Sequence, residues 1–198
     1  MKKIVLAMLL LLMSVLTYAQ TATQVLDKAA AVLSVKSGVK ADFKATMAQG
    51  TISGTIAVKG NKFMATTQHT KVWFDGKTQW TYLSKNDEVN VSNPKDSELQ
   101  SLNPYNFITL YRQGYKSTMN KNSTSYVVHL TATSKNKPVQ EMFITVNKKT
   151  YAPSQVKMLQ GKKWVTFDVS NLKQVKLADS FFRFNAKDFS TAEVIDLR

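Results

Sequence analysis

Twelve residues decide the fold class of this chain: Lys71-Val72-Trp73-Phe74-Asp75-Gly76-Lys77-Thr78-Gln79-Trp80-Thr81-Tyr82. The Asp-Gly pair separates two runs that are rich in aromatic and β-branched residues, which is the pattern of a tight β-hairpin. We therefore expect a mainly β protein with an unusual amount of aromatic surface.

Apolar and polar residues alternate with a period of two on both sides of this hairpin, as half-buried strands require. The first such strand has Ala41, Phe43, Ala45 and Met47 on one face. About ten strands with short turns between them predict an antiparallel sheet that curves strongly into an unclosed half-barrel. The strands predicted after the hairpin cover residues 88–92, 115–119, 126–133, 139–146, 151–159, 163–176 and 191–196.

Three segments have helical patterns. Residues 23–35 carry apolar residues at helical spacing, and Ser37-Gly38 follows as a stop signal. Asn93-Pro94 and Asn103-Pro104 each place a capping residue before a proline at the first helical position, and Gly114 ends the second of these helices. We expect these helices to form a lid over the concave face of the sheet, enclosing an apolar cavity.

The N-terminus has the pattern of an export signal. Lys2 and Lys3 precede an apolar run over residues 4–16, and Thr17-Tyr18-Ala19 ends it with residues that a signal peptidase reads. We predict a signal peptide over residues 1–19 that is cleaved after Ala19, and a single domain over residues 20–198. An uncleaved anchor fits less well, because the run is shorter than the roughly 20 residues that span a membrane.

The chain is strongly basic and contains no cysteine. The formal charge is +14, from 27 Lys and Arg against 13 Asp and Glu. This charge favours acidic lipid headgroups or an acidic protein as partners, although most of the lysines have the spacing of residues that solvate strand faces. The basic residues are dispersed and the chain is exported, so we expect no nucleic-acid partner. Without cysteine, neither a disulfide nor a lipid-modified cysteine is available.

The sequence carries no recognisable catalytic equipment. His69 and His129 lie on separate predicted strands without a suitably spaced cysteine or carboxylate, so we expect no metal ion and no cofactor. Phosphate-binding loops and nucleophile elbows are both missing. We predict a protein that is not an enzyme, although a carboxylate pair assembled by the fold stays open at this point.

The order and spacing of several pieces resemble the periplasmic carriers of outer-membrane lipoproteins, the LolA-like family. The pieces are the first helix leading into Val39-Lys40-Ala41-Asp42-Phe43, the strand over residues 54–59, Phe63, the hairpin over residues 75–82, Asn103-Pro104-Tyr105 and Phe182-Arg183-Phe184. The resemblance covers nearly the whole mature chain. It implies an unclosed barrel with a helical lid over an apolar cavity, and a monomeric carrier in the periplasm.

The resemblance also implies partners and site residues. The cargo would be acylated lipoproteins or other lipids, received from a releasing transporter of the inner membrane and handed to an outer-membrane acceptor. In the family an arginine after the strand over residues 54–59 latches the lid, whereas this chain has Lys59-Gly60-Asn61-Lys62, so Lys59 and Lys62 are the candidate latch. The candidate cavity lining is Phe43, Ile52, Ile56, Phe63, Trp73, Trp80, Leu99, Leu102, Phe107, Ile108 and Tyr111.

Two other functions are compatible with this sequence. One is a carrier of a different lipid on the same fold. The other is a regulatory domain that senses lipids or lipoproteins in the groove and passes the signal to another protein by contact.

Overall fold

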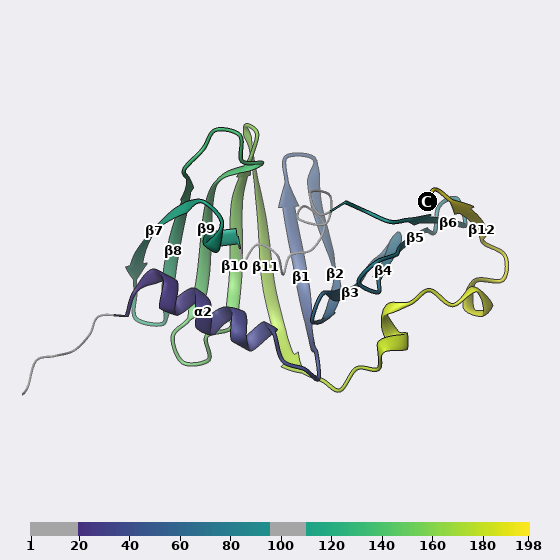
Figure 1. Cartoon of the computed structure of the whole chain (residues 1–198), viewed down its shortest axis with the longest axis horizontal. Coiled ribbons are helices and arrows are strands. Elements are labelled where there is room, and N and C mark those ends of the chain that lie inside the picture. Colours follow the sequence, from purple (N-terminus) through teal and green to yellow (C-terminus); the bar gives the residue numbers. More distant parts are fainter. Residues whose placement is uncertain (1–19, 96–109) are drawn as a thin grey trace, which may run out of the picture.

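The computed structural model describes residues 20–95 and 110–198, and within these ranges twelve strands form a single sheet (Figure 1). The prediction of a mainly β, largely antiparallel protein is confirmed, with more strands than the ten or so expected. The strands are β1 (Val39–Met47), β2 (Gly50–Lys59), β3 (Lys62–Thr67), β4 (Thr70–Phe74), β5 (Gln79–Leu83), β6 (Glu88–Ser92), β7 (Tyr115–Lys121), β8 (Ser125–Ala132), β9 (Val139–Asn147), β10 (Pro153–Gln160), β11 (Lys163–Gln174) and β12 (Glu193–Asp196). The helical elements are α2 (Ala22–Leu33) and the short 3₁₀ helices η1 (Leu110–Arg112), η2 (Asp179–Phe182) and η3 (Ala186–Phe189).

The first strand lies in the middle of the sheet. The strand order is β12-β6-β5-β4-β3-β2-β1-β11-β10-β9-β8-β7, so two meanders, β1 to β6 and β7 to β11, meet where β1 pairs with β11. The final strand differs from the predicted antiparallel meander, because β12 pairs with β6 in parallel. The chain between β11 and β12 returns across the sheet to the far side of the first meander, where β12 aligns with β6 (Figure 1).

The hairpin predicted around Asp75-Gly76 is confirmed as β4 and β5. Its loop has four residues, since Phe74 pairs with Gln79. Asp75 Oδ1 accepts hydrogen bonds from the N–H groups of Lys77 (3.1 Å) and Thr78 (2.9 Å), as an aspartate in a turn typically does. Gly76 has φ +102°, a conformation that favours glycine.

Helix α2 begins with a capping box. The side chain of Thr21 accepts a hydrogen bond from the N–H of Gln24 at 3.2 Å, and the side chain of Gln24 accepts one from the N–H of Thr21 at 3.0 Å. The helix ends at Leu33, two residues earlier than predicted. Its apolar side is buried, with Val25 and Leu26 fully inaccessible to solvent.

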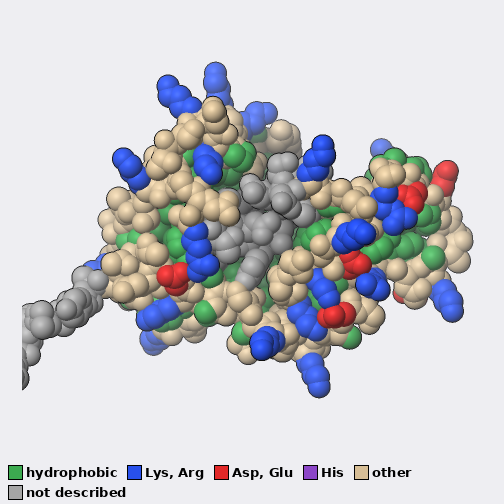
Figure 2. Space-filling view, in the orientation of Figure 1, with side chains coloured by type: hydrophobic (Ala, Val, Ile, Leu, Met, Phe, Trp, Pro, Cys, Tyr) green, Lys and Arg blue, Asp and Glu red, His purple; other side chains and the backbone are tan. Residues whose placement is uncertain are grey.

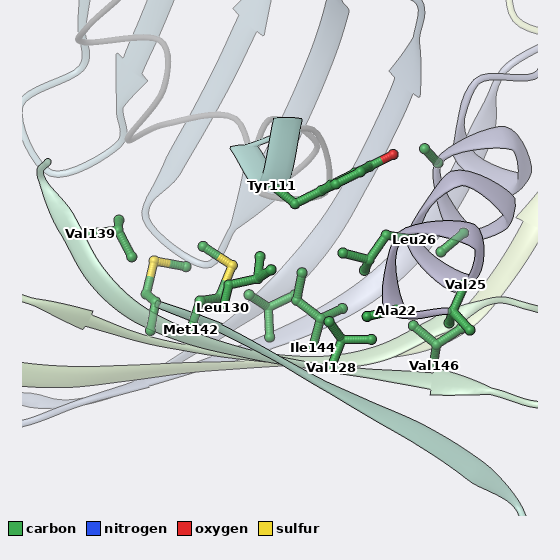
Figure 3. Packing of buried hydrophobic residues seen from close by; sticks show 14 residues of the cluster. Ala22, Val25, Leu26, Tyr111, Val128, Leu130, Val139, Met142, Ile144 and Val146 are labelled. Atoms are coloured by element: carbon green, nitrogen blue, oxygen red, sulfur yellow. The ribbon is translucent and has the colours of Figure 1, made fainter. Parts of the chain in front are cut away.

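The main core lies between α2 and the strands β8, β9 and β10. In Figure 3, Val25 and Leu26 of the helix lie above side chains of the sheet, and Tyr111 lies above the core on the same side of the sheet. Burying a side chain such as Leu26 contributes about 1.5–3 kcal/mol, so this cluster anchors the helix on one half of the sheet. The buried residues of the cluster are Ala22, Val25, Leu26, Ala29, Ala30, Tyr111, Val128, Leu130, Val139, Met142, Ile144, Val146, Val156 and Met158.

Several predictions fall outside the described residues. These are the signal peptide, the helix predicted after Asn93 beyond Lys95, the helix predicted after Asn103 up to residue 109, and the four candidate cavity residues Leu99, Leu102, Phe107 and Ile108. Residues 93–95, where the first of these helices was predicted to begin, are described and are not helical. Among the described residues, no helix has the length and apolar character needed to cross a membrane.

Candidate functional site

The sheet has two faces that differ in what covers them. We call the side on which α2 packs the helix face; on the first meander it carries Val58, Phe63 and Phe74, which form a buried cluster that Leu33 of α2 contacts. We call the opposite side the tail face. Residues 177–189, here named the tail segment, pack on it through a cluster of Ala57, Leu177 and Phe182.

The helix face carries an apolar strip beyond the end of α2. Register places Phe43 opposite Gly54, Ala45 opposite Ile52 and Ala41 opposite Ile56 on this face. The side chains under α2 are inaccessible, whereas Phe43 and Ile56 are only half-buried and Ile52 is 46 % exposed. A β-branched or aromatic residue in the middle of a sheet is normally covered, so this strip is apolar surface that the described residues leave partly open.

Gly54 makes room for the ring of Phe43. A Cβ atom at position 54 would lie 3.0 Å from Phe43 Cε1 and 2.0 Å from the carbonyl oxygen of Thr66. Only glycine therefore fits here, and the Phe43 ring covers the backbone of β2 where a side chain is missing. The strip continues onto β11 through Val169, which pairs with Phe43.

The predicted cavity residues divide between the two faces. Phe43, Ile52, Ile56 and Phe63 lie on the helix face, and Phe63 is fully buried against Phe74, with 5.4 Å between the ring centroids. The sequence predicts Trp73 and Trp80 in the same cavity, but the structure places both on the tail face.

Strand geometry explains this separation. Trp73 follows Val72 and precedes Phe74, and successive side chains of a strand point to opposite faces. Trp80 pairs with Trp73 across the hairpin, so the two tryptophans share a face. Sequence reasoning selected the largest aromatic residues and missed Val72 and Phe74, although the alternation in β4 already separates these two from Trp73.

Tyr111 joins the core to a polar group at the surface. Its hydroxyl donates a hydrogen bond to Asp27 Oδ1, and it accepts one from Arg112 Nε at 3.0 Å. Hydrogen bonds from Tyr111 and Arg112 hold the pKa of Asp27 below its ordinary value. Burial, together with the hydrogen bond to Asp27, raises the pKa of Tyr111. These contacts tie η1 to α2 on the helix face.

The two candidate latch lysines contact the tail segment. Lys59 Nζ lies 2.9 Å from Asp179 Oδ1 and donates to the carbonyl oxygen of Leu177 at 2.8 Å, and Lys62 Nζ lies 2.7 Å from Asp179 Oδ2. The hydrogen bonds from Lys62 and Lys59 lower the pKa of Asp179 to about 2. Among the described residues, these lysines therefore hold the C-terminal part of the chain.

The sequence of residues 12–162 matches the family described as outer membrane lipoprotein carrier protein LolA. The chain belongs to the LolA family. Members of this family are periplasmic carriers and generally not enzymes. A comparison with curated proteins found no match.

Several solved structures resemble this chain at low sequence identity. An uncharacterised conserved protein from Thermus thermophilus has a TM-score of 0.61 and 13% identity, with 88% of this chain and 98% of that chain covered. A LolA-superfamily protein from Nitrosomonas europaea has a TM-score of 0.46 and 12% identity, covering 84% and 99% of the two chains. A putative outer-membrane lipoprotein-sorting protein domain from Vibrio parahaemolyticus has a TM-score of 0.47 and 14% identity, covering 84% and 97%.

In this LolA-family chain, the described histidine and carboxylate side chains are dispersed. No three His, Cys, Asp or Glu residues among the described residues are grouped so that they could hold a metal ion. His129 lies 2.8 Å from Glu141 Oε1 and stacks on Phe143, which accounts for its position without a ligand. The described part of the helix face offers a ligand the apolar strip of Phe43, Ile52 and Ile56.

Proposed function

We propose that the protein is a periplasmic carrier that binds the acyl chains of lipoproteins and moves them from the inner to the outer membrane. One observation carries this proposal: the apolar strip of Phe43, Ile52 and Ile56 continues the core along the helix face beyond α2 and is left partly open. Membership of the LolA family supports the choice of acyl chains as the ligand.

The energetics of the cargo require such a surface. Each CH₂ group that leaves an apolar environment for water costs about 0.8 kcal/mol, so a lipoprotein with several acyl chains does not leave a membrane unaided. A carrier needs a surface of similar apolar quality that is covered in transit. A strip of aliphatic side chains and one aromatic ring provides such an apolar surface. It contains no polar groups that would have to be desolvated when a chain binds.

We infer that the sheet curves round this strip as a half-barrel and that the chain between β6 and η1 serves as its lid. The two described ends of this connection support the inference. β6 lies next to one edge of the sheet and β7 forms the other edge, so the connection joins opposite sides. It re-enters the described structure at η1, on the helix face, where Tyr111 packs in the core with α2.

The remaining parts of the proposal follow from the family and from the charge. The protein would be made with a cleaved signal peptide and act as a monomer. It would receive its cargo from an inner-membrane transporter and give it to an outer-membrane acceptor. Lysine and arginine side chains are spread over the face seen in Figure 2 and acidic ones are few, which suits contact with acidic surfaces of membranes or of those partners.

A release assay tests the proposal. Purified protein is incubated with spheroplasts that display a labelled triacylated lipoprotein, and the supernatant is separated on a sizing column. We expect a soluble complex of one protein with one lipoprotein. If folded protein releases nothing while mass spectrometry finds a free lipid bound to it, the protein is a carrier of another lipid, and lipoprotein carriage is refuted under those conditions.

A further inference from the structure

The tail face contains a groove that the helix-face site does not use. Two adjoining hollows, of about 740 Å³ and about 990 Å³, lie between the tail segment and strands β1 to β4 and β11. Lys40, Met64 and Phe181 line both hollows, so the two form one continuous groove. Each hollow taken alone has the size of a small-molecule site, which typically measures 300–1,000 Å³.

The floor of the groove is aromatic. Trp73 is almost fully buried there, with its ring centroid 5.7 Å from that of Phe184 and 5.5 Å from that of Phe189, both in edge-to-face packing. Phe181, Phe184 and Phe189 of the tail segment remain half-buried, so their rings are still accessible from the groove. Such a floor suits an aliphatic chain.

The rim of the groove is basic. Four lysines and one arginine line it against two carboxylates, Asp42 and Asp188. Asn171 donates a hydrogen bond to Asp42 at 2.6 Å, and Asn185 donates one to Asp188 at 3.2 Å. The basic residues are Lys40, Lys71, Lys173, Lys176 and Arg183.

Most of these cations lack an anionic partner. Arg183 pairs with Asp75 at 3.2 Å, but the four lysines form no ion pair with a carboxylate among the described residues. Lys40 Nζ lies 4.5 Å from the ring centroid of Phe181, and Lys71 Nζ lies 5.4 Å from that of Phe189. The groove therefore holds an excess of positive charge directly beside its apolar floor.

We propose that this groove is a second ligand site, which binds one anionic phospholipid with its phosphate between Lys40 and Lys71 and an acyl chain along the aromatic floor. Lysine ammonium groups bind phosphate well as point charges. The cations and aromatic rings of this site lie on the opposite side of the sheet from the apolar strip, although Ala41 and Ile56 also line one of the hollows. The inference does not rest on the proposed carrier function.

An acidic peptide fits the groove less well. Peptides that bind along a sheet add a strand to an exposed edge and gain main-chain hydrogen bonds. The strands β1 to β4 and β11 that form the wall each pair with neighbours on both sides, so their main chain offers no free edge. An amphiphile needs only apolar contact and cations, which this groove supplies.

Binding of short-chain phospholipids tests the proposal. Dihexanoyl phosphatidylglycerol, dihexanoyl phosphatidylcholine, inorganic phosphate and oligoglutamate are each titrated into the purified protein by calorimetry. The double variant Lys40→Gln/Lys71→Gln is compared with Lys116→Gln/Lys121→Gln, which removes the same charge from two exposed lysines of β7 at the far edge of the sheet. Ile52→Glu reports on binding at the helix face, and circular dichroism checks that each variant is folded.

We expect phosphatidylglycerol to bind about tenfold or more tightly than phosphatidylcholine and inorganic phosphate, because it alone supplies both the net charge and the chain. The Lys40/Lys71 variant should weaken this binding by about tenfold or more, and the β7 variant and Ile52→Glu should not change it. Equal binding by the Lys40/Lys71 variant overturns the proposal. Loss of binding in Ile52→Glu alone also overturns the proposal, because it would show that the phospholipid binds at the helix face. Binding of oligoglutamate in place of the phospholipid assigns the groove to an acidic protein.

A fluorescence measurement does not depend on the lysine variants. In Trp164→Phe, which removes the one tryptophan outside the hairpin, phosphatidylglycerol with a brominated chain should quench the emission of Trp73 and Trp80. Phosphatidylglycerol that binds without quenching would place its chain away from the aromatic floor and contradict the proposal.

Discussion

Asp27 in α2 and Arg112 at the end of η1 form an ion pair, with 2.7 Å between Asp27 Oδ1 and Arg112 Nη2. The same carboxylate oxygen accepts a hydrogen bond from the hydroxyl of Tyr111. One acidic side chain thus connects the first helix to the point where the chain re-enters the described structure, and a disturbance there should change how firmly η1 is held.

We predict that Asp27→Asn loosens η1 more than it destabilises the whole protein. Both side chains of the ion pair are about half exposed, so screening keeps the loss in the free energy of unfolding small. Hydrogen exchange should accelerate at residues 110–114 and stay unchanged in β8 and β9. A cycle with Arg112→Gln isolates the pair, and additive losses in the double variant would show that the two residues do not interact.

Acid should release the tail segment through Asp179. The folded pKa of Asp179 is about 2, against an ordinary value of 3.8, so its contribution to stability is complete at neutral pH. This contribution decreases as the pH falls below about 4 and is lost as the pH passes through 2.

Urea unfolding at pH values between 5 and 2 measures this effect. Asp179→Asn should lower the stability at neutral pH and flatten the decline between pH 4 and 2. An unchanged pH profile in Asp179→Asn would mean that the ion pairs with Lys59 and Lys62 do not stabilise the fold. Asp188→Asn, on the same segment but without an ion pair among the described residues, is the matched control.

Gly54→Ala should be strongly destabilising. Its Cβ atom would approach the carbonyl oxygen of Thr66 to 2.0 Å, a main-chain contact that no side-chain rotation relieves. Forcing an extra carbon into a packed site costs about 1–3 kcal/mol, which urea unfolding resolves. Ser53→Ala, at the exposed neighbouring position, should change the stability by less than about 0.5 kcal/mol. Equal stability of the two variants would contradict the close packing of β2 and β3.

Substitutions at neighbouring positions of β2 separate the two faces by function. Ile52→Glu places a charge in the apolar strip and should abolish acyl-chain binding at the helix face and lipoprotein release, because a carboxylate in an apolar site must be desolvated. Ser53→Glu adds the same charge one residue later, on the tail face, and should leave release unchanged. Release that survives Ile52→Glu would exclude this strip from the binding site. Circular dichroism confirms that both variants fold.

The elements of the sheet were largely predictable, and their arrangement was not. Alternation in the sequence predicts β4 and β5 and the loop at Asp75-Gly76 between them, because strand periodicity and turn chemistry are local. The pairing of β1 with β11 joins residues about 130 positions apart, such as Phe43 and Val169, and no local pattern contains it. The parallel β12 depends in the same way on the path of the tail segment across the sheet.

The candidate site was predicted in composition but not in position. Phe43, Ile52 and Ile56 form the apolar strip, whereas Trp73 and Trp80 face the tail segment. Alternation along the strand shows that the side chains of Trp73 and Phe74 point to opposite faces of the sheet. Only the packing of α2 decides which of these faces is the helix face.

By itself the sequence determined the strand-rich fold class, the hairpin, the first helix and the family. These depend on residues close together in the chain. The tertiary structure alone decided that Lys59 and Lys62 meet Asp179, and that five basic residues surround an aromatic groove. Both arrangements bring together side chains more than 100 residues apart, and they form only after the tail segment has packed on the sheet.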